Sequence, residues 1–141
     1  TLEENSEWYG WNHKESHKHY PFDNIRVVLS DEYSVDTGYR LELNSKNRSM
    51  TVLYKNGKQA ASVPQTGNFP MKYRGGHSPY SPRSNRIMFV KREGVLSAFV
   101  NGVRVLTYKD PDPFEVTRVG IGGYKTRVNF SHIEIRNLGD S

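Results

Sequence analysis

The chain has 141 residues, enough to enclose one hydrophobic core, and this length predicts a single domain over 1–141. Its net charge is +5. Hydrophobic residues make up 35% and aromatic residues 12%, a mixture that argues against a helical bundle and suits a thin sandwich with rings on its surface. The absence of cysteine excludes disulfides and cysteine metal sites, and no apolar run approaches the ~20 residues of a membrane span.

Short strands separated by turns are predicted along the chain from β-rich and alternating apolar runs. No segment longer than one or two turns shows the 3.6-residue apolar period of an amphipathic helix. This pattern, with its Gly, Asn and Pro punctuation, predicts an all-β fold: a two-sheet antiparallel β-sandwich of the jelly-roll type. The predicted strands span 26–29, 39–43, 50–54, 58–63, 87–91, 95–100, 103–108, 117–121 and 132–138.

Two Asn-Gly pairs predict two-residue hairpin turns, because both turn positions need a positive φ. The first, Asn56-Gly57, sets Val52 opposite Ala61 and Leu53 opposite Ala60.

The second turn, Asn101-Gly102, joins the strands over 95–100 and 103–108, and Glu93-Gly94 links the first of them to 87–91. The three strands therefore form a meander. The second turn sets Val100 opposite Val103 and Ala98 opposite Val105 on one face, and places on the other face Phe99, Leu106 and Tyr108.

Charge is distributed unevenly, since the fifty residues from Leu43 to Arg92 contain no Asp or Glu. This asymmetry predicts a positive field over part of the surface, which would attract an anionic partner. The alternative is a solvated face that serves solubility. The basic residues of the stretch are Lys46, Arg48, Lys55, Lys58, Lys72, Arg74, Arg83, Arg86, Lys91 and Arg92.

The closing half of the chain carries a family resemblance. A strand pair around V-N-G lies in 94–108, D-P-D-P-F spans 110–114, G-I-G-x-Y spans 120–124, and a returning strand lies in 128–135. These segments resemble the concanavalin A-like lectin/glucanase superfamily, most closely the laminin-G-type carbohydrate-binding modules of bacterial polysaccharide-degrading enzymes. Upstream runs fit the same pattern, so the resemblance covers residues 22–138. It implies a two-sheet antiparallel jelly roll that binds sugar, often without catalysis.

The sequence departs from the catalytic members of that superfamily. The acidic E-x-D-x-x-E strand motif of the glucanases is absent, and Glu42 and Glu134 each stand alone on their strands. The R-x-E-x-R and Q-I-H strands of jelly-roll alginate lyases are also missing. The resemblance therefore implies no catalytic residues.

The segment Pro64–Asn85 is predicted to be a long loop, and loops of this length are usually functional or disordered. Tyrosine rings can stack on a sugar face while arginine forks bind sulfate or carboxylate groups. The alternative is that the aromatics of the loop, including Phe69, pack as a satellite core. The candidate ligand-binding residues here are Tyr73, Arg74, His77, Tyr80 and Arg83.

A second candidate lies near the start of the chain, where both tryptophans occur. Trp8 and Trp11 are stacking platforms for a pyranose, with His13 and Lys14 beside them. The alternative is that one Trp closes an end of the sandwich, and Trp11 is expected to be the exposed one.

A third candidate is the connection between the last two strands. Lys125 and Arg127 are expected to project together from a hairpin tip, next to Tyr124. The tip would add cations to an anion site if it lay near the long loop.

Metal binding has little support in the sequence. The spacing of His13, His17 and His19 brings two imidazoles to one side only in a regular segment, and no carboxylate pair is fixed beside them. Calcium needs clustered oxygens, which could come from Asp31, Glu32 and Asp36 or from Asp110 and Asp112. No cofactor is assigned. Structural calcium, common in the superfamily that the chain resembles, stays open.

These observations predict a non-catalytic carbohydrate-binding module that recognises an anionic polysaccharide, sulfated or uronate-containing, by ring stacking and Arg/Lys contacts. A small jelly-roll polysaccharide lyase or glycoside hydrolase is the alternative, since Tyr73, Arg74, His77 and Tyr80 contain the groups for β-elimination. Nucleic acid is not expected as a partner, because no RNP-like, OB-like or helix-turn-helix pattern occurs.

The expected context is extracellular or cell-surface. The chain opens at Thr1 in a polar stretch without a signal peptide, as in a mature protein or excised module. The further expectations are no membrane partner, a monomer, and a covalently linked catalytic domain in the parent protein.

Overall fold

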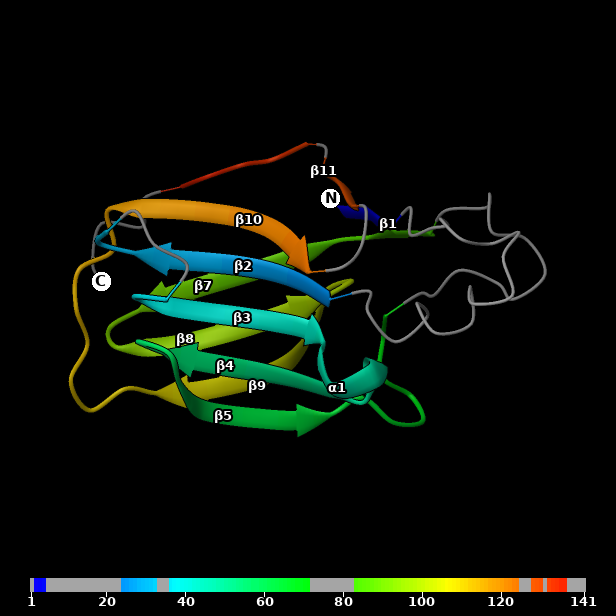
Figure 1. The fold of residues 1–141 in the computed structure, drawn as a ribbon, viewed down its shortest axis with the longest axis horizontal. Helices are drawn as coiled ribbons and strands as arrows, with labels where there is room; N and C mark the ends of the chain where they lie inside the picture. The colour runs from blue at the N-terminus through cyan, green and yellow to red at the C-terminus, as the bar shows by residue number, and fades with distance from the viewer. Residues whose placement is uncertain are drawn as a thin grey trace.

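The computed structural model describes residues 2–4, 24–32, 36–71, 83–124, 128–130 and 132–136. Within these ranges it contains eleven strands and one four-residue helix (Figure 1). The elements are β1 (Leu2–Glu4), β2 (Asn24–Ser30), β3 (Tyr39–Asn44), α1 (Ser45–Arg48), β4 (Met50–Lys55), β5 (Lys58–Pro64), β6 (Arg83–Asn85), β7 (Ile87–Arg92), β8 (Val95–Val100), β9 (Val103–Lys109), β10 (Arg118–Tyr124) and β11 (Val128–Phe130).

The strands form two main antiparallel sheets. The larger sheet has the order β10-β2-β3-β4-β5, so the late strand β10 pairs with the early strand β2. The smaller sheet has the order β7-β8-β9, and a further small sheet has the order β11-β1-β6. Figure 1 shows the five-stranded sheet lying over β7, β8 and β9. The predicted all-β, two-sheet antiparallel sandwich is confirmed.

The main core lies between these two sheets. Alternate residues of β3 and β4, such as Leu41 and Leu53, point inward and pack against Leu96 and Leu106 of the smaller sheet. Burying each such leucine contributes ~1.5–3 kcal/mol to stability. Every predicted strand from 26–29 to 117–121 is present, with ends within three residues of the prediction, whereas β6 was not predicted.

A second core cluster closes one end of the sandwich. Ile25, Leu43 and Val100 pack there against Met71, and Phe69 lies half-buried beside them. The segment after β5 thus contributes a buried methionine and a packed ring, so Phe69 belongs to the packing alternative. The predicted 22-residue loop was also too long, because β5 extends to Pro64 and 83–85 form β6.

The first predicted hairpin register needs a correction. The turn is as expected, with positive φ at Asn56 and Gly57. Beyond it the register shifts by one residue between Leu53 and Tyr54, so Leu53 faces Ala61 and Val52 faces Ser62. The predicted partners, Ala60 and Ala61, are wrong because β5 contains an extra residue, a β-bulge that a turn motif does not reveal.

The second hairpin shows the same kind of shift. Val100 faces Val103 as predicted, but Ala98 faces Leu106 instead of Val105. The register shift between Ala98 and Phe99 puts Leu106 and Tyr108 on the core face. The prediction had placed both of them on the opposite face, with Phe99. A one-residue slip exchanges the two faces of a strand, so this bulge decides which side chains of β9 face solvent.

The end of the chain also differs from the prediction. A strand was expected over 132–138, but the described part, 132–136, forms no strand, and the late strand is β11 at 128–130, paired with β1. Ile133 and Ile135 are exposed. Among the described residues, no helix has the length and apolar character needed to cross a membrane.

Candidate functional site

Most of the predicted ligand-binding residues lie outside the described ranges. They are Trp8, Trp11, His13, Lys14, Tyr73, Arg74, His77, Tyr80, Lys125 and Arg127. Two predicted residues have a described backbone: Arg83 begins β6 and Tyr124 ends β10. Arg83 pairs with Glu4 and Tyr124 with Asn24.

The described basic residues of the acid-free stretch do not gather on one face. Lys58 is exposed at the turn between β4 and β5, whereas Arg92 is exposed at the end of β7 in the other sheet. Lys55 is bound to Asp110. The charge asymmetry of the sequence therefore does not itself define a surface.

A compact surface is instead formed by the outward side chains of β7, β8 and β9, here called the basic-aromatic face. Its side chains form three rows, because directly opposed residues of antiparallel strands point to the same side. The rows are Met88–Phe99–Arg104, Val90–Ser97–Thr107 and Arg92–Val95–Lys109.

The first row places a cation against a ring. The guanidinium of Arg104 lies 5.4 Å from the centroid of the Phe99 ring, with Arg104 exposed and Phe99 half-buried. Met88, on the other side of Phe99, is 48% exposed. The pair thus stacks a guanidinium fork over a ring, and the two together with Met88 supply the cationic and apolar groups that bind a charged sugar.

An open pocket of about 330 Å³ extends along this face from the first row to the third. Its lining is mainly apolar, with cations at its two ends. The two cations in the lining are Arg92 and Arg104, and a third exposed cation, Lys109, pairs with Val95 in the third row. Glu93, at the adjoining turn, is the acidic residue of the lining. The face therefore has a net positive charge of two. The lining residues are Met88, Val90, Arg92, Glu93, Val95, Ser97, Phe99 and Arg104.

The sequence contained a signal for this face that the predicted register concealed. Thr107 and Lys109 are polar, whereas Leu106 and Tyr108 are apolar, and this alternation alone indicates that the second pair faces the core. Pairing counted from the Asn101-Gly102 turn without a bulge assigns Thr107 and Lys109 to the core face and Leu106 and Tyr108 to the solvent face. Recognising a bulge in β9 would have placed Lys109 in the same row as Arg92, on the other side of Val95.

The outer side of the five-stranded sheet carries a different cluster. The buried carboxylate of Glu42 lies 3.1 Å from Nε of Arg26 and 2.9 Å from Nε of Arg40, and it accepts a hydrogen bond from Asn24 at 3.3 Å. The guanidinium of Arg40 stacks over Tyr54 at 4.5 Å from the ring centroid. Asp36 Oδ1 also lies 3.6 Å from Nη1 of Arg40, so two carboxylates offset the two guanidinium groups, and the cluster holds strands β2, β3 and β4 together.

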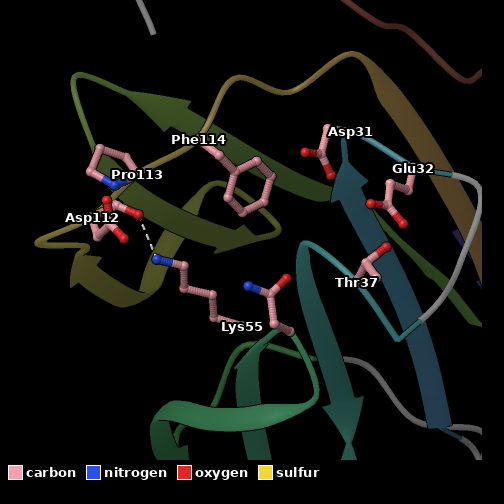
Figure 2. A pocket seen from close by; sticks show the side chains of 8 residues that line it. Asp31, Glu32, Thr37, Lys55, Asp112, Pro113 and Phe114 are labelled. Carbon is pink, nitrogen blue, oxygen red and sulfur yellow. Dashed lines mark hydrogen bonds between the residues drawn. The ribbon is translucent and has the colours of Figure 1, made fainter.

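A third feature is a pocket of about 310 Å³ at one end of the sandwich, where β2, β4 and the segment after β9 meet. Figure 2 shows Phe114 between Asp31 and Glu32 on one side and Asp112 and Pro113 on the other, with Lys55 below. Three carboxylates line this pocket against one ammonium. Its charge is unsuited to an anionic polymer.

Behind this pocket lies a buried network around Asp110, whose side chain is 1% exposed. Tyr39 donates a hydrogen bond to Asp110 at 2.5 Å, and Lys55 Nζ lies 2.7 Å from the same carboxylate. Lys55 also donates to the backbone oxygen of Asp112 at 2.6 Å. The ring of Tyr39 stacks on Phe114 at 4.5 Å between centroids. The network ties the segment after β9 to β3 and β4.

The network shifts the pKa values of two groups. Burial would raise the pKa of Asp110, but hydrogen bonds from Lys55, Tyr39 and the backbone of Asp112 outweigh it and hold that pKa below its usual value. Burial, then the hydrogen bond to Asp110, raises the pKa of Tyr39 above its ordinary value. Ionised Asp110 and neutral Tyr39 are therefore the states that the fold favours.

These pKa shifts predict a dependence of stability on pH in both directions. The contribution of Asp110 should be complete above its unfolded pKa of about 3.9 and be lost as pH falls through the lower folded value. That of Tyr39 should be complete below about pH 10 and be lost as pH rises towards its higher folded value. Urea unfolding from pH 3 to 11 should show that Asp110→Asn flattens the acid decline and Tyr39→Phe the alkaline decline. A variant with the wild-type decline would contradict the assignment for that residue.

The described residues do not bring together the carboxylates considered from the sequence for calcium. Asp31, Glu32 and Asp112 line one pocket, but among the described residues no three His, Cys, Asp or Glu side chains group closely enough to hold a metal ion. Asp110 is engaged by Lys55 and Tyr39 instead. The histidines 13, 17 and 19 lie outside the described ranges.

No family model matches the sequence, and no curated protein is significantly similar to it.

Proposed function

We propose that this protein is a non-catalytic carbohydrate-binding module that binds an anionic polysaccharide through the basic-aromatic face. One observation carries the proposal: the Arg104 guanidinium lies over the Phe99 ring on an open, mainly apolar surface with further cations at its other end. A sugar ring would lie on Phe99 and Met88 while Arg104 pairs with a sulfate or carboxylate.

The other two surfaces suit this ligand less well. At the outer side of the five-stranded sheet, the guanidinium groups of Arg26 and Arg40 already contact Glu42. The end pocket carries Asp31, Glu32 and Asp112, which would repel an anion. The basic-aromatic face combines exposed cations with an exposed apolar surface, and this combination favours it.

The biological setting belongs to the same proposal. We infer an extracellular or cell-surface module of the concanavalin A-like type, with jelly-roll topology, monomeric and linked to a polysaccharide-degrading domain. The resemblance of 94–135 to laminin-G-type modules supports this setting, and the two-sheet antiparallel fold is compatible with it.

Replacing Arg104 with glutamine should weaken binding to a sulfated polysaccharide about fivefold, which corresponds to ~1 kcal/mol for one exposed charge contact. Isothermal titration of wild type and variant, at low and physiological salt, measures the effect. Binding of both should weaken as salt rises, because exposed charges are screened over about 8 Å at physiological ionic strength.

The matched control is Lys58→Gln, which removes one exposed charge at the β4–β5 turn of the other sheet. It should change the affinity less than twofold. Equal losses from Arg104→Gln and Lys58→Gln would show that net charge, rather than this face, attracts the polymer. Equal binding of sulfated and neutral polymers by wild type would end the anionic assignment.

A further inference from the structure

The cations of the basic-aromatic face are arranged in a pattern that selects among anionic polymers. Arg104 lies in the first row and Arg92 and Lys109 lie in the third. The middle row consists of Val90, Ser97 and Thr107, none of which is charged. Along the strands, the face therefore reads positive, neutral, positive.

The separation of the charged rows follows from strand geometry. Phe99 and Val95, which mark the first and third rows on β8, are four residues apart. At ~3.3 Å per residue the rows lie about 13 Å apart along the strand. This span exceeds the length of one sugar unit, so a polymer with an acidic group on every sugar would place one of them over the middle row.

An acidic group over the middle row would lose water without gaining a cation as a partner. Val90 would remove water from it, while Ser97 and Thr107 could each offer one hydroxyl but no charge. A neutral sugar at the same place would use these hydroxyls as hydrogen-bond partners and rest on Val90. The middle row thus favours a neutral unit between two acidic ones.

We propose that this face selects polysaccharides in which acidic sugars alternate with neutral ones, over polymers with an acidic group on every sugar. The inference rests on the proposed function. It assigns Arg104 to one acidic group, Arg92 or Lys109 to the next, and the middle row to the neutral sugar between them.

The test compares two polymers of opposite pattern at equal carboxylate concentration. Hyaluronan has one carboxylate per two sugars, and polygalacturonate has one on every sugar. Titration at physiological salt should show about tenfold tighter binding of hyaluronan, although simple charge density favours polygalacturonate. Arg92→Gln and Arg104→Gln should each reduce this preference.

A second variant reverses the pattern. Ser97→Lys places a cation in the half-exposed centre of the neutral row and should bring the two affinities to within about twofold. Thr107→Lys, in the same row on β9, should shift the preference in the same direction. Thermal melting verifies that both variants fold.

The outcomes separate this inference from the function on which it rests. Equal binding of both polymers, or tighter binding of polygalacturonate, with affinity lost in Arg104→Gln, would overturn the spacing and leave the module intact. No binding of either polymer, or of sulfated polymers, would overturn both. A hyaluronan preference that Ser97→Lys leaves unchanged would also overturn the role of the middle row.

Discussion

Replacing Asp110 with alanine is expected to lower the free energy of unfolding by about 2–4 kcal/mol. The substitution leaves Lys55, whose side chain is 20% exposed, without its carboxylate partner and the buried Tyr39 hydroxyl without its acceptor. Removing one partner of a buried ion pair costs about 3–5 kcal/mol, and the partial exposure of Lys55 moderates this. Urea unfolding at pH 7 measures the change.

Asp112→Ala is the control for that experiment. Asp112 contacts Lys55 through its backbone oxygen, and its exposed side chain lines the end pocket. Its replacement should therefore change stability by less than about 0.5 kcal/mol. A similar loss in Asp110→Ala and Asp112→Ala would mean that general charge balance, and not the buried network, stabilises this end of the sandwich.

Gly38→Ala is expected to destabilise the fold by about 2–4 kcal/mol, because two effects combine. Gly38 has φ +81°, a conformation that disfavours any Cβ. An added Cβ would also lie 2.5 Å from the carbonyl oxygen of Leu29 and 2.7 Å from Cα of Ser30. The contacted atoms are mainly backbone of the paired strand β2, so relief requires the sheet itself to move.

Gly122→Ala is the matched control on β10. A Cβ at Gly122 meets nothing within 4 Å, and its φ lies outside the left-handed region. Because glycine weakens a strand by ~0.5–1 kcal/mol relative to alanine, this variant should be unchanged or slightly more stable. Thermal unfolding of both variants tests the contrast. A Gly38→Ala protein as stable as wild type would contradict the close packing of β2 against the turn before β3.

Local sequence patterns predicted the strands and turns of this fold well. The Asn-Gly and Glu-Gly pairs marked three turns whose residues all have positive φ. Alternation located the strands because one face of each sheet is buried. The two register errors have one cause, an extra residue in β5 and another in β9, which pairing from the turn cannot detect.

The side-chain clusters were harder to predict because they join distant parts of the chain. Tyr39 and Asp110 are 71 residues apart in sequence but share a hydrogen bond. Glu42, read from the sequence as an isolated acid, contacts Arg26 because β2 and β3 pair in a register that brings the two opposite each other. These contacts depend on how the strands are arranged in space. Residue type alone therefore predicted neither the Tyr39–Asp110 hydrogen bond nor the Glu42–Arg26 ion pair.

The extra residue in β9 has an evolutionary consequence. It sets the register of the strand so that Leu106 packs in the core while Thr107 and Lys109 point to solvent. Deleting this residue would exchange the inward and outward positions of β9 on one side of the bulge and expose Leu106. With it in place, the outward positions of β7, β8 and β9 can change one at a time without disturbing the interior. The chemistry of this face can therefore change by point substitution alone.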